Sequence, residues 1–143
     1  ERDTEVTGSI EVHLWASTTA LDTDFTAKLL DVYPPSSEFP EGLDINISDS
    51  IIRARYRNGF EKSELTEPNE IYEFVFELYP TSNVFAKGHR IRVDISSSNW
   101  PRFDVNHNTG RPLGTDRTYE VARQTIHHSK EHPSYVLLPI NRD

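Results

Sequence analysis

Cysteine is absent from this chain of 143 residues, so neither a disulfide nor a thiolate metal ligand can hold it together. A domain of this length buries roughly 68% of the surface that its unfolded chain exposes, which suffices for a hydrophobic core without such links. Methionine is absent too, and the chain begins with Glu1, so we expect a fragment of a longer protein or a processed product. The lack of cysteine slightly favours a cytoplasmic origin and leaves the compartment open.

Basic residues are the minority: 15 lysines and arginines stand against 23 acids, and the formal net charge is −8. Such a surface repels phosphate backbones, so we expect no nucleic-acid partner. Apolar runs span only a few residues, so we expect no membrane span, and no signal-peptide pattern opens the chain. The composition leaves the oligomeric state open.

What the chain does contain is a hydrophobic period of two, which is typical of β-strands. Apolar and polar side chains alternate in residues 10–16, 72–78 and 91–95. The less regular strand candidates are residues 25–33, 45–47, 52–56, 119–127 and 135–140. Turn signals such as Asn58-Gly59 separate them. The pattern predicts one all-β domain over residues 1–143, a sandwich or jelly roll with about eight strands.

Two segments depart from this pattern. Residues 81–86 follow Pro80 and end before Gly88, which predicts at most one short helical or 3₁₀ turn. Residues 99–118, rich in Asn, Pro, Gly and Arg, form the longest stretch without a period. A loop of this length in a compact domain is usually functional, packed by its own side chains, or disordered.

A catalytic serine has no recognisable setting in this chain. The G-x-S-x-G elbow is absent, and nothing near Ser96-Ser97-Ser98 looks like a base held by a carboxylate. Serines at the end of a strand are more often hydrogen-bonding turn residues. We therefore expect no catalytic residue here.

Three histidines, His127, His128 and His132, lie close in sequence beside Glu131. Neighbouring residues of a strand point to opposite faces, and a structural zinc site typically includes cysteine. A polar hairpin is therefore the favoured interpretation, and a metal site is the alternative.

An acidic loop, Asp22-Thr23-Asp24, precedes a predicted strand. Two carboxylates at this spacing can ligate calcium, but no third carboxylate follows in the series of an EF-hand. A structural turn or a docking loop is favoured. We expect neither a metal nor a cofactor in this chain.

Arg53, Arg55 and Arg57 alternate along a predicted strand and would share one face. They would bind an anion there, or they would pair with Glu73 and Glu77 of a neighbouring strand. The net acidity of the chain favours the pairing interpretation.

Aromatic residues interrupt the long loop at Trp100 and Phe103, on either side of Arg102. Such a loop suits a docking surface or a sugar site, and it suits equally well an aromatic plug at one end of the sandwich. The Trp100–Pro101 bond is a candidate for a cis peptide.

Six segments carry a resemblance that no single motif would support: residues 7–17, 22–34, 52–57, 78–85, 88–104 and 132–134. Together they resemble the C-terminal domain of the X-Pro dipeptidyl peptidase family of serine hydrolases. Cocaine esterase, glutaryl-7-aminocephalosporanic acid acylase and α-amino acid ester hydrolase belong to the same family. The departures are modest: Trp100 stands where phenylalanine is more usual, residues 128–131 replace an expected His-Asp pair, and residues 34–43 form a longer, proline-rich segment.

The resemblance implies a jelly-roll β-sandwich similar to galactose-binding-like modules. In the family this domain packs against an α/β-hydrolase domain with a helical cap and borders its substrate cleft, and the Ser-His-Asp triad lies wholly in the hydrolase domain. The parent protein would thus be a hydrolase of the dipeptidyl peptidase, acylase or esterase type, and this domain would be non-catalytic alone. Phe25 is our candidate for facing acyl groups in the cleft. The expected interdomain or cleft contacts are Asp22, Asp24, Phe25, Trp100, Arg102 and Phe103.

Two other functions stay open. The likeness to galactose-binding folds suggests a carbohydrate-binding module, for which Trp15, Trp100 and Tyr135 are the candidate aromatics. A free-standing interaction domain is the third possibility, and both the missing start methionine and the family resemblance speak against it.

Overall fold

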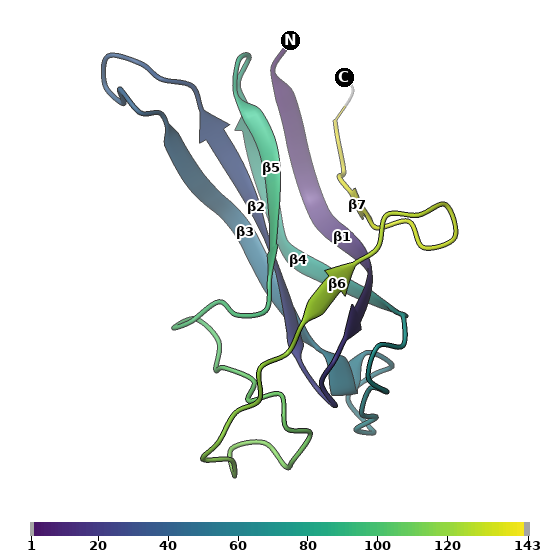
Figure 1. Cartoon of the computed structure of the whole chain (residues 1–143). Coiled ribbons are helices and arrows are strands. Elements are labelled where there is room, and N and C mark those ends of the chain that lie inside the picture. Colours follow the sequence, from purple (N-terminus) through teal and green to yellow (C-terminus); the bar gives the residue numbers. More distant parts are fainter. Residues whose placement is uncertain (1, 142–143) are drawn as a thin grey trace.

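Two antiparallel β-sheets packed face to face make up the computed structural model, which describes residues 2–141 (Figure 1). The first sheet has the order β4-β1-β6, with β7 also paired to β1, and the second has the order β3-β2-β5. The strands are β1 Thr4–Thr18, β2 Asp24–Tyr33, β3 Leu43–Arg53, β4 Tyr72–Phe85, β5 Arg90–Ser96, β6 Gln124–Ile126 and β7 Tyr135–Leu137. The described residues thus form seven strands, which confirms the prediction of an all-β sandwich.

Alternation along β1 explains its place at the centre of the first sheet. Val12 and Leu14 are at most 2% exposed and face the second sheet, whereas His13 between them is only partly buried. The antiparallel register sets Val12 opposite Phe76 and Leu14 opposite Phe74. Burial of one such side chain contributes roughly 1.5–3 kcal/mol, so this face of β1 is a main source of the sandwich's stability.

The central strand of the second sheet, β2, is covered on both faces. Phe25, Ala27 and Leu29 point into the core and are at most 1% exposed. Asp24 and Thr26, on the opposite face, are also at most 1% exposed. Another part of the chain therefore covers the outer face of this sheet at the start of β2.

The helical turn predicted for residues 81–86 is wrong. β4 continues through this segment to its last residue, Phe85, which lies opposite Thr4 of β1 and is 2% exposed. Pro80, which suggested the start of a turn, falls at a β-bulge in the β1–β4 ladder. A bulge tolerates proline because the residue there need not donate to the ladder.

The strand predicted for residues 52–56 ends early, because β3 stops at Arg53 and a 3₁₀ turn, η1, spans Ala54–Tyr56. Ala54 donates its N–H to the carbonyl of Thr23 at 2.8 Å, which turns the backbone toward the loop before β2. Among residues 2–141, no helix is long and apolar enough to cross a membrane.

The strand predicted for residues 119–127 is also shorter in the structure. Only the three residues of β6 pair with β1, and Val121 is 98% exposed outside the sheet. Likewise, β7 is the only strand in residues 135–140. Residues 34–42 form a turn-rich connection between β2 and β3.

The sandwich is closed along one side and open along the other. On the closed side β3 contacts β4, and the hydroxyl of Ser48 donates to the carbonyl of Tyr79 at 2.6 Å. On the open side β5 faces β6 and β7 across a groove that β1 also lines, and Figure 1 shows β1 between β5 and β7.

Candidate functional site

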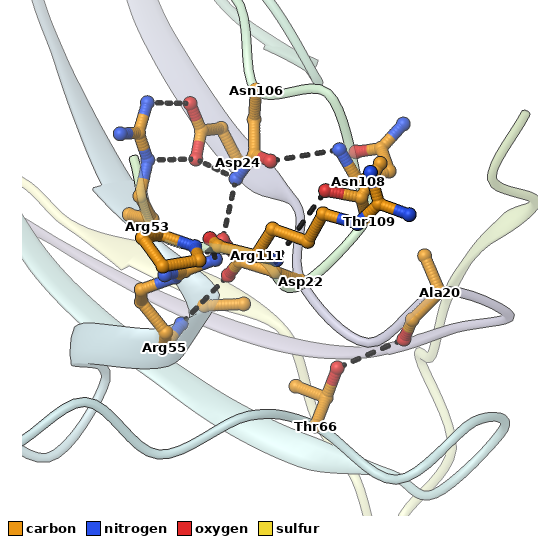
Figure 2. Close-up of polar contacts among 12 residues, drawn as sticks. Ala20, Asp22, Asp24, Arg53, Arg55, Thr66, Asn106, Asn108, Thr109 and Arg111 are labelled. Atoms are coloured by element: carbon orange, nitrogen blue, oxygen red, sulfur yellow. Dashed lines mark hydrogen bonds and ion pairs between the residues drawn. The ribbon is translucent and has the colours of Figure 1, made fainter. Parts of the chain in front are cut away.

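A buried network of two carboxylates and two guanidinium groups lies at one end of the sandwich (Figure 2). Asp22 lies in the turn before β2 and Asp24 begins that strand, while Arg53 ends β3 and Arg55 lies in η1. Antiparallel pairing of β2 with β3 sets Asp24 opposite Arg53. The 3₁₀ turn then brings Arg55 back over the same end of the sandwich, where it meets Asp22.

Each arginine of the network pairs with one carboxylate. Arg53 donates from Nε and Nη2 to the two oxygens of Asp24, at 2.8 and 2.9 Å. Arg55 donates from Nε to Asp22 Oδ2 at 2.7 Å and from its backbone N–H to Oδ1 at 3.0 Å. Both carboxylates are at most 1% exposed. Buried charges persist only when they are paired and hydrogen-bonded, so each member of this network requires the others.

The surroundings of Arg53 keep it charged. Its hydrogen bond with Asp24 is the largest cause that raises the pKa of the guanidinium; burial opposes this effect, and the charges of Asp24 and Asp104 add to it. Asp104 lies 3.2 Å from Nη2 but is 78% exposed, so its contribution is screened by water. The pairing with Asp24 is therefore the interaction that matters most.

Asn106 ties the long loop of residues 99–118 to this network. Its Nδ2 donates to Asp22 Oδ2 at 2.9 Å and to Asp24 Oδ1 at 2.8 Å, as Figure 2 shows. Its Oδ1 accepts the backbone N–H of Asn108 at 2.9 Å. One amide thus bridges both buried carboxylates and fixes the local turn, so the loop is packed at this point.

A second contact holds the loop further along. Arg55 donates from Nη2 to the carbonyl of Arg111 at 2.9 Å, and Arg111 lies 3.3 Å from a carboxylate oxygen of Asp116. Gly110 has a φ of +73°, and a Cβ at this position would lie 2.9 Å from Leu21 Cβ. The close approach and the left-handed backbone together require glycine here.

A third contact holds the aromatic end of the loop. Asp49 of β3 is 4% exposed, and its carboxylate accepts from Arg102 Nε and Asn99 Nδ2, each at 2.9 Å. The Trp100–Pro101 peptide between them is cis, as the sequence suggested. Trp100 is 70% exposed on this turn.

A cavity of about 580 Å³ opens between the network and the loop. Arg53, Arg55 and Trp100 line it, and the rest of its lining is Asp104, Val105, Asn106, His107, Thr109, Arg111, Pro112, Leu113, Gly114 and Asp116. The guanidinium groups that face this space are already paired with carboxylates. His107 also lines this space, and its buried Nδ1 has no hydrogen-bond partner among the described residues.

Three of the predicted contact residues, Asp22, Asp24 and Phe25, are buried within the domain itself. Phe25 packs against Phe74, with ring centroids 4.8 Å apart, and is 1% exposed. Its side chain belongs to the core, so a role in lining a cleft is not compatible with this structure. The carboxylates of Asp22 and Asp24 instead hold the long loop in place by accepting hydrogen bonds from Asn106.

The other three predicted contact residues lie at or near the surface of the same end. Trp100 and Arg102 are exposed, and Phe103 is half-buried. The guanidinium carbon of Arg102 lies 5.6 Å from the centre of the Phe103 ring and 5.5 Å from that of Tyr79. The structure therefore brings the acidic loop and the aromatic loop together, through side chains that the sequence analysis did not single out.

Those missed residues are Asn106 and Asp49. Asn106 begins the run Asn106-His107-Asn108-Thr109-Gly110, whose composition signals a tight turn. Asp49 is an acid within β3 that is nevertheless buried. Neither signal identifies a partner, because the carboxylates bound by Asn106 lie more than eighty residues earlier in the chain.

The predicted pairing of the three alternating arginines with Glu73 and Glu77 is wrong. β3 ends at Arg53, so the arginines do not share one strand face. Glu73 instead contacts His13 Nδ1 at 2.9 Å. Arg57 donates to two backbone carbonyls, at 3.0 and 2.5 Å, and its guanidinium lies 4.3 Å from the centre of the Tyr72 ring.

The histidine segment forms the polar hairpin that the sequence favoured. The hydroxyl of Ser134 accepts the Trp15 N–H at 2.9 Å and donates to the carbonyl of His127 at 2.7 Å. The rings of His127 and His132 are 6.0 Å apart. Within residues 2–141, no three or more histidine, aspartate or glutamate side chains are arranged to hold a metal ion.

Of the three aromatics considered for sugar binding, Trp15 and Tyr135 lie near each other, because β1 pairs with β7 there, and Trp100 lies elsewhere. Trp15 contacts the ring of His132, Tyr135 stacks on His13, and Trp100 lines the cavity at the end of the sandwich. A sugar site needs aromatic and polar groups that converge. The structure does not bring these three together.

Comparison with known proteins agrees with this architecture. The family described as the X-Pro dipeptidyl-peptidase C-terminal non-catalytic domain matches residues 1–137. Cocaine esterase of a Rhodococcus species is 46% identical over 138 residues, which are 95% of this chain and 23% of that protein. A putative serine esterase of Mycobacterium bovis is 30% identical, over 88% of this chain and 21% of that protein.

Solved structures give the same result. An α-amino acid ester hydrolase superposes with a TM-score of 0.90 at 34% identity, over 98% of this chain and 24% of that one. An aminopeptidase from a marine-sediment Thaumarchaeota archaeon superposes with a TM-score of 0.91 at 31% identity, over 99% of this chain and 24% of that one. The chain spans about a quarter of the length of these proteins. With residues 1–137 matched and the fold reproduced, this chain belongs to the family of X-Pro dipeptidyl-peptidase C-terminal non-catalytic domains.

Proposed function

We propose that this chain is the accessory domain of a larger serine hydrolase and that it packs against the α/β-hydrolase domain through the surface around Trp100. We call this the Trp100 surface and define it by Trp100, Val105 and Leu113. These side chains are 70%, 48% and 44% exposed, and all three line the cavity at the end of the sandwich. Exposed apolar side chains on a loop held by buried ion pairs are the observation that carries the proposal.

The rigidity of the loop favours docking. An interface between domains of one chain typically buries about 600–1,500 Å², and ordering a flexible loop would offset part of the free energy gained. Here Asn106 and Asp49 already hold the loop on the sandwich, so little order remains to be imposed. A single exposed tryptophan beside a cavity is also the kind of residue that dominates interface energetics.

The names of the relatives support the kind of partner. They describe two esterases, an amino acid ester hydrolase and an aminopeptidase, all of which cleave ester or amide bonds. The present domain corresponds to less than a quarter of each, so most of each chain lies elsewhere. We infer that the Trp100 surface borders the substrate cleft of such a catalytic domain.

The proposal is tested by Trp100→Ala in the full-length parent enzyme. Loss of an aromatic anchor is expected to weaken docking by about 2 kcal/mol, because the ring fills space that water would otherwise occupy. Hydrogen exchange of residues 104–116 should accelerate, and kcat/KM for ester or amide substrates should fall.

The matched control is Val84→Ala. Val84 is 53% exposed and lies opposite Glu5, at the other end of β1 from the network. This variant is expected to leave both readouts at the parental values. If Trp100→Ala behaves like the control in a folded enzyme, the proposed packing is wrong.

A further inference from the structure

The groove on the open side of the sandwich is lined by side chains of the kind that form a core. Val12 and Leu14 of β1 lie on one side, Val93 and Ile95 of β5 on the other, and Val136 of β7 at its margin. The groove has a volume of about 380 Å³. Val12 and Leu14 are nevertheless at most 2% exposed, and the apolar area in contact with water lies at the rim of the groove, where Ile95 is 36% and Tyr135 43% exposed.

The β5 strand borders this groove as a free edge. Among the described residues it pairs only with β2, in an unbroken register from Arg90 to Ser96. In an antiparallel pair, every second residue directs its N–H and C=O away from the partner strand. The segment contains no proline and no bulge, two of the devices that protect an edge, and its charged side chains Arg90, Arg92 and Asp94 alternate with the apolar ones.

The two faces of β5 differ in chemistry. Val93 and Ile95 face the groove, whereas Arg92 lies on the opposite face, where it pairs with Asp44 at 2.8 Å and Asp94 at 3.0 Å. A strand placed beside β5 would continue both faces. It would carry apolar side chains toward the groove and polar side chains toward the water, alternating along its length.

We propose that a β-strand of this amphipathic kind, supplied by the parent chain outside residues 1–143, pairs with the free edge of β5 and closes the groove. The inference rests on the proposed function in one respect, namely that the domain is part of a larger protein. It does not require that the strand come from the catalytic domain.

A strand of the same chain fits better than a second copy. The chain corresponds to 23% of cocaine esterase and 24% of the α-amino acid ester hydrolase, so a long stretch of parent chain is available. Tethering gives such a strand an effective concentration of about the millimolar range. A stable complex between separate copies buries on the order of 1,200–2,000 Å², which is more than a groove along a seven-residue edge offers.

Thiol reactivity in the full-length parent tests this proposal, because the domain has no cysteine of its own. Ile95→Cys places a thiol in the groove, where the side chain is 36% exposed in the domain alone. Arg90→Cys is the control, exposed on the outward face of the same strand. We expect alkylation at position 95 to be at least about tenfold slower than at position 90, each relative to the urea-unfolded protein. Equal relative rates would overturn the proposal.

Site-resolved hydrogen exchange of the unmodified parent tests for a strand rather than another cover. All amides of β5 should be protected, including those that point away from β2. If the thiol at position 95 is shielded but every second amide of β5 exchanges fast, a helix or loop covers the groove instead of a strand. If protection falls on dilution, a second copy of the protein covers it. Either result sinks the inference.

A thiol at Leu113→Cys separates this inference from the proposed function. Protection at position 113 without protection at position 95 contradicts the strand and leaves the packing of the Trp100 surface intact. Protection at position 95 without protection at position 113 supports the added strand and contradicts the packing of the Trp100 surface.

Discussion

Asp24 is a carboxylate removed almost completely from water, and three groups make that possible. It accepts two bonds from Arg53 and one from Asn106, with all three distances between 2.8 and 2.9 Å. Desolvation of an ion is costly, and paired charges repay it only with good geometry and further hydrogen bonds. The surrounding structure therefore depends on this carboxylate, and both of its oxygens accept hydrogen bonds within the domain.

Removal of that carboxylate should be strongly destabilising. Asp24→Ala leaves Arg53 buried beside only the exposed Asp104, so we expect the free energy of unfolding to fall by about 3–5 kcal/mol. Asp104→Ala removes the exposed partner instead and should cost about 1 kcal/mol or less. Urea denaturation of both variants makes the comparison, and similar losses would show that the bidentate pair is not the stronger one.

His13 makes the stability of the sandwich depend on pH. Its Nδ1 lies 2.9 Å from Glu73 and its Nε2 lies 2.6 Å from Glu11. The hydrogen bond with Glu73 is the largest cause that raises the pKa of His13 above its ordinary 6.5, burial opposes it, and Glu11 adds to it. Because the folded pKa is the higher one, this stabilisation is fully present below the unfolded pKa and is lost as pH rises through the folded pKa.

We therefore expect His13→Gln to lower the free energy of unfolding more at about pH 5.5 than at about pH 9. Urea denaturation across this range provides the measurement. Glu73→Gln removes the main cause of the shift and should reduce the same pH dependence. An equal loss at both ends of the range would show that the histidine acts through packing on Tyr135 rather than through its charge.

At the scale of elements, the long loop behaves as part of the sandwich because its contacts are buried. Asn106→Ala removes both bonds to the carboxylates, so we expect a loss of about 1–3 kcal/mol and faster hydrogen exchange across residues 104–116. Asn58→Ala is a matched control, since Asn58 bonds Glu64 at the surface. A loop whose exchange is unchanged without Asn106 would mean that Asp49 and Arg111 suffice to hold it.

Strands with a clean alternation could be predicted from sequence, and this holds for most of β1, β4 and β5. The strand conformation of residues 81–85 could not be predicted, because the pairing of Phe85 with Thr4 joins segments about eighty residues apart. The prediction that the three alternating arginines share one strand face failed for a related reason. Their spacing fits a strand, but an N–H bond from Ala54 to Thr23 ends the ladder at Arg53.

The candidate site was predictable only in its parts. The acidic loop and the aromatic loop are visible in the sequence as unusual compositions. Their meeting depends on Asn106, whose amide reaches carboxylates of another loop, and on the burial that makes those contacts strong. Side-chain geometry of this kind follows from the tertiary fold and has no local signature.

At the scale of the whole molecule, two surfaces lie on different parts of the sandwich. The Trp100 surface caps one end, and the groove beside β5 runs along the open side. Other exposed apolar side chains, such as Phe60 and Val121, line neither the cavity nor the groove. A larger protein can thus hold the domain by two independent contacts.

The three-way pairing of β1 has a consequence for how the protein is made. Residues 11–13 of that strand pair with β7, and residues 16–18 pair with β6, so the first strand of this domain to be synthesised awaits the last two. Contacts of such wide sequence separation slow folding, and the waiting strand exposes an edge meanwhile. Synthesis therefore runs almost the full length of this domain before β1 is covered on that side, and chaperones have that interval in which to act.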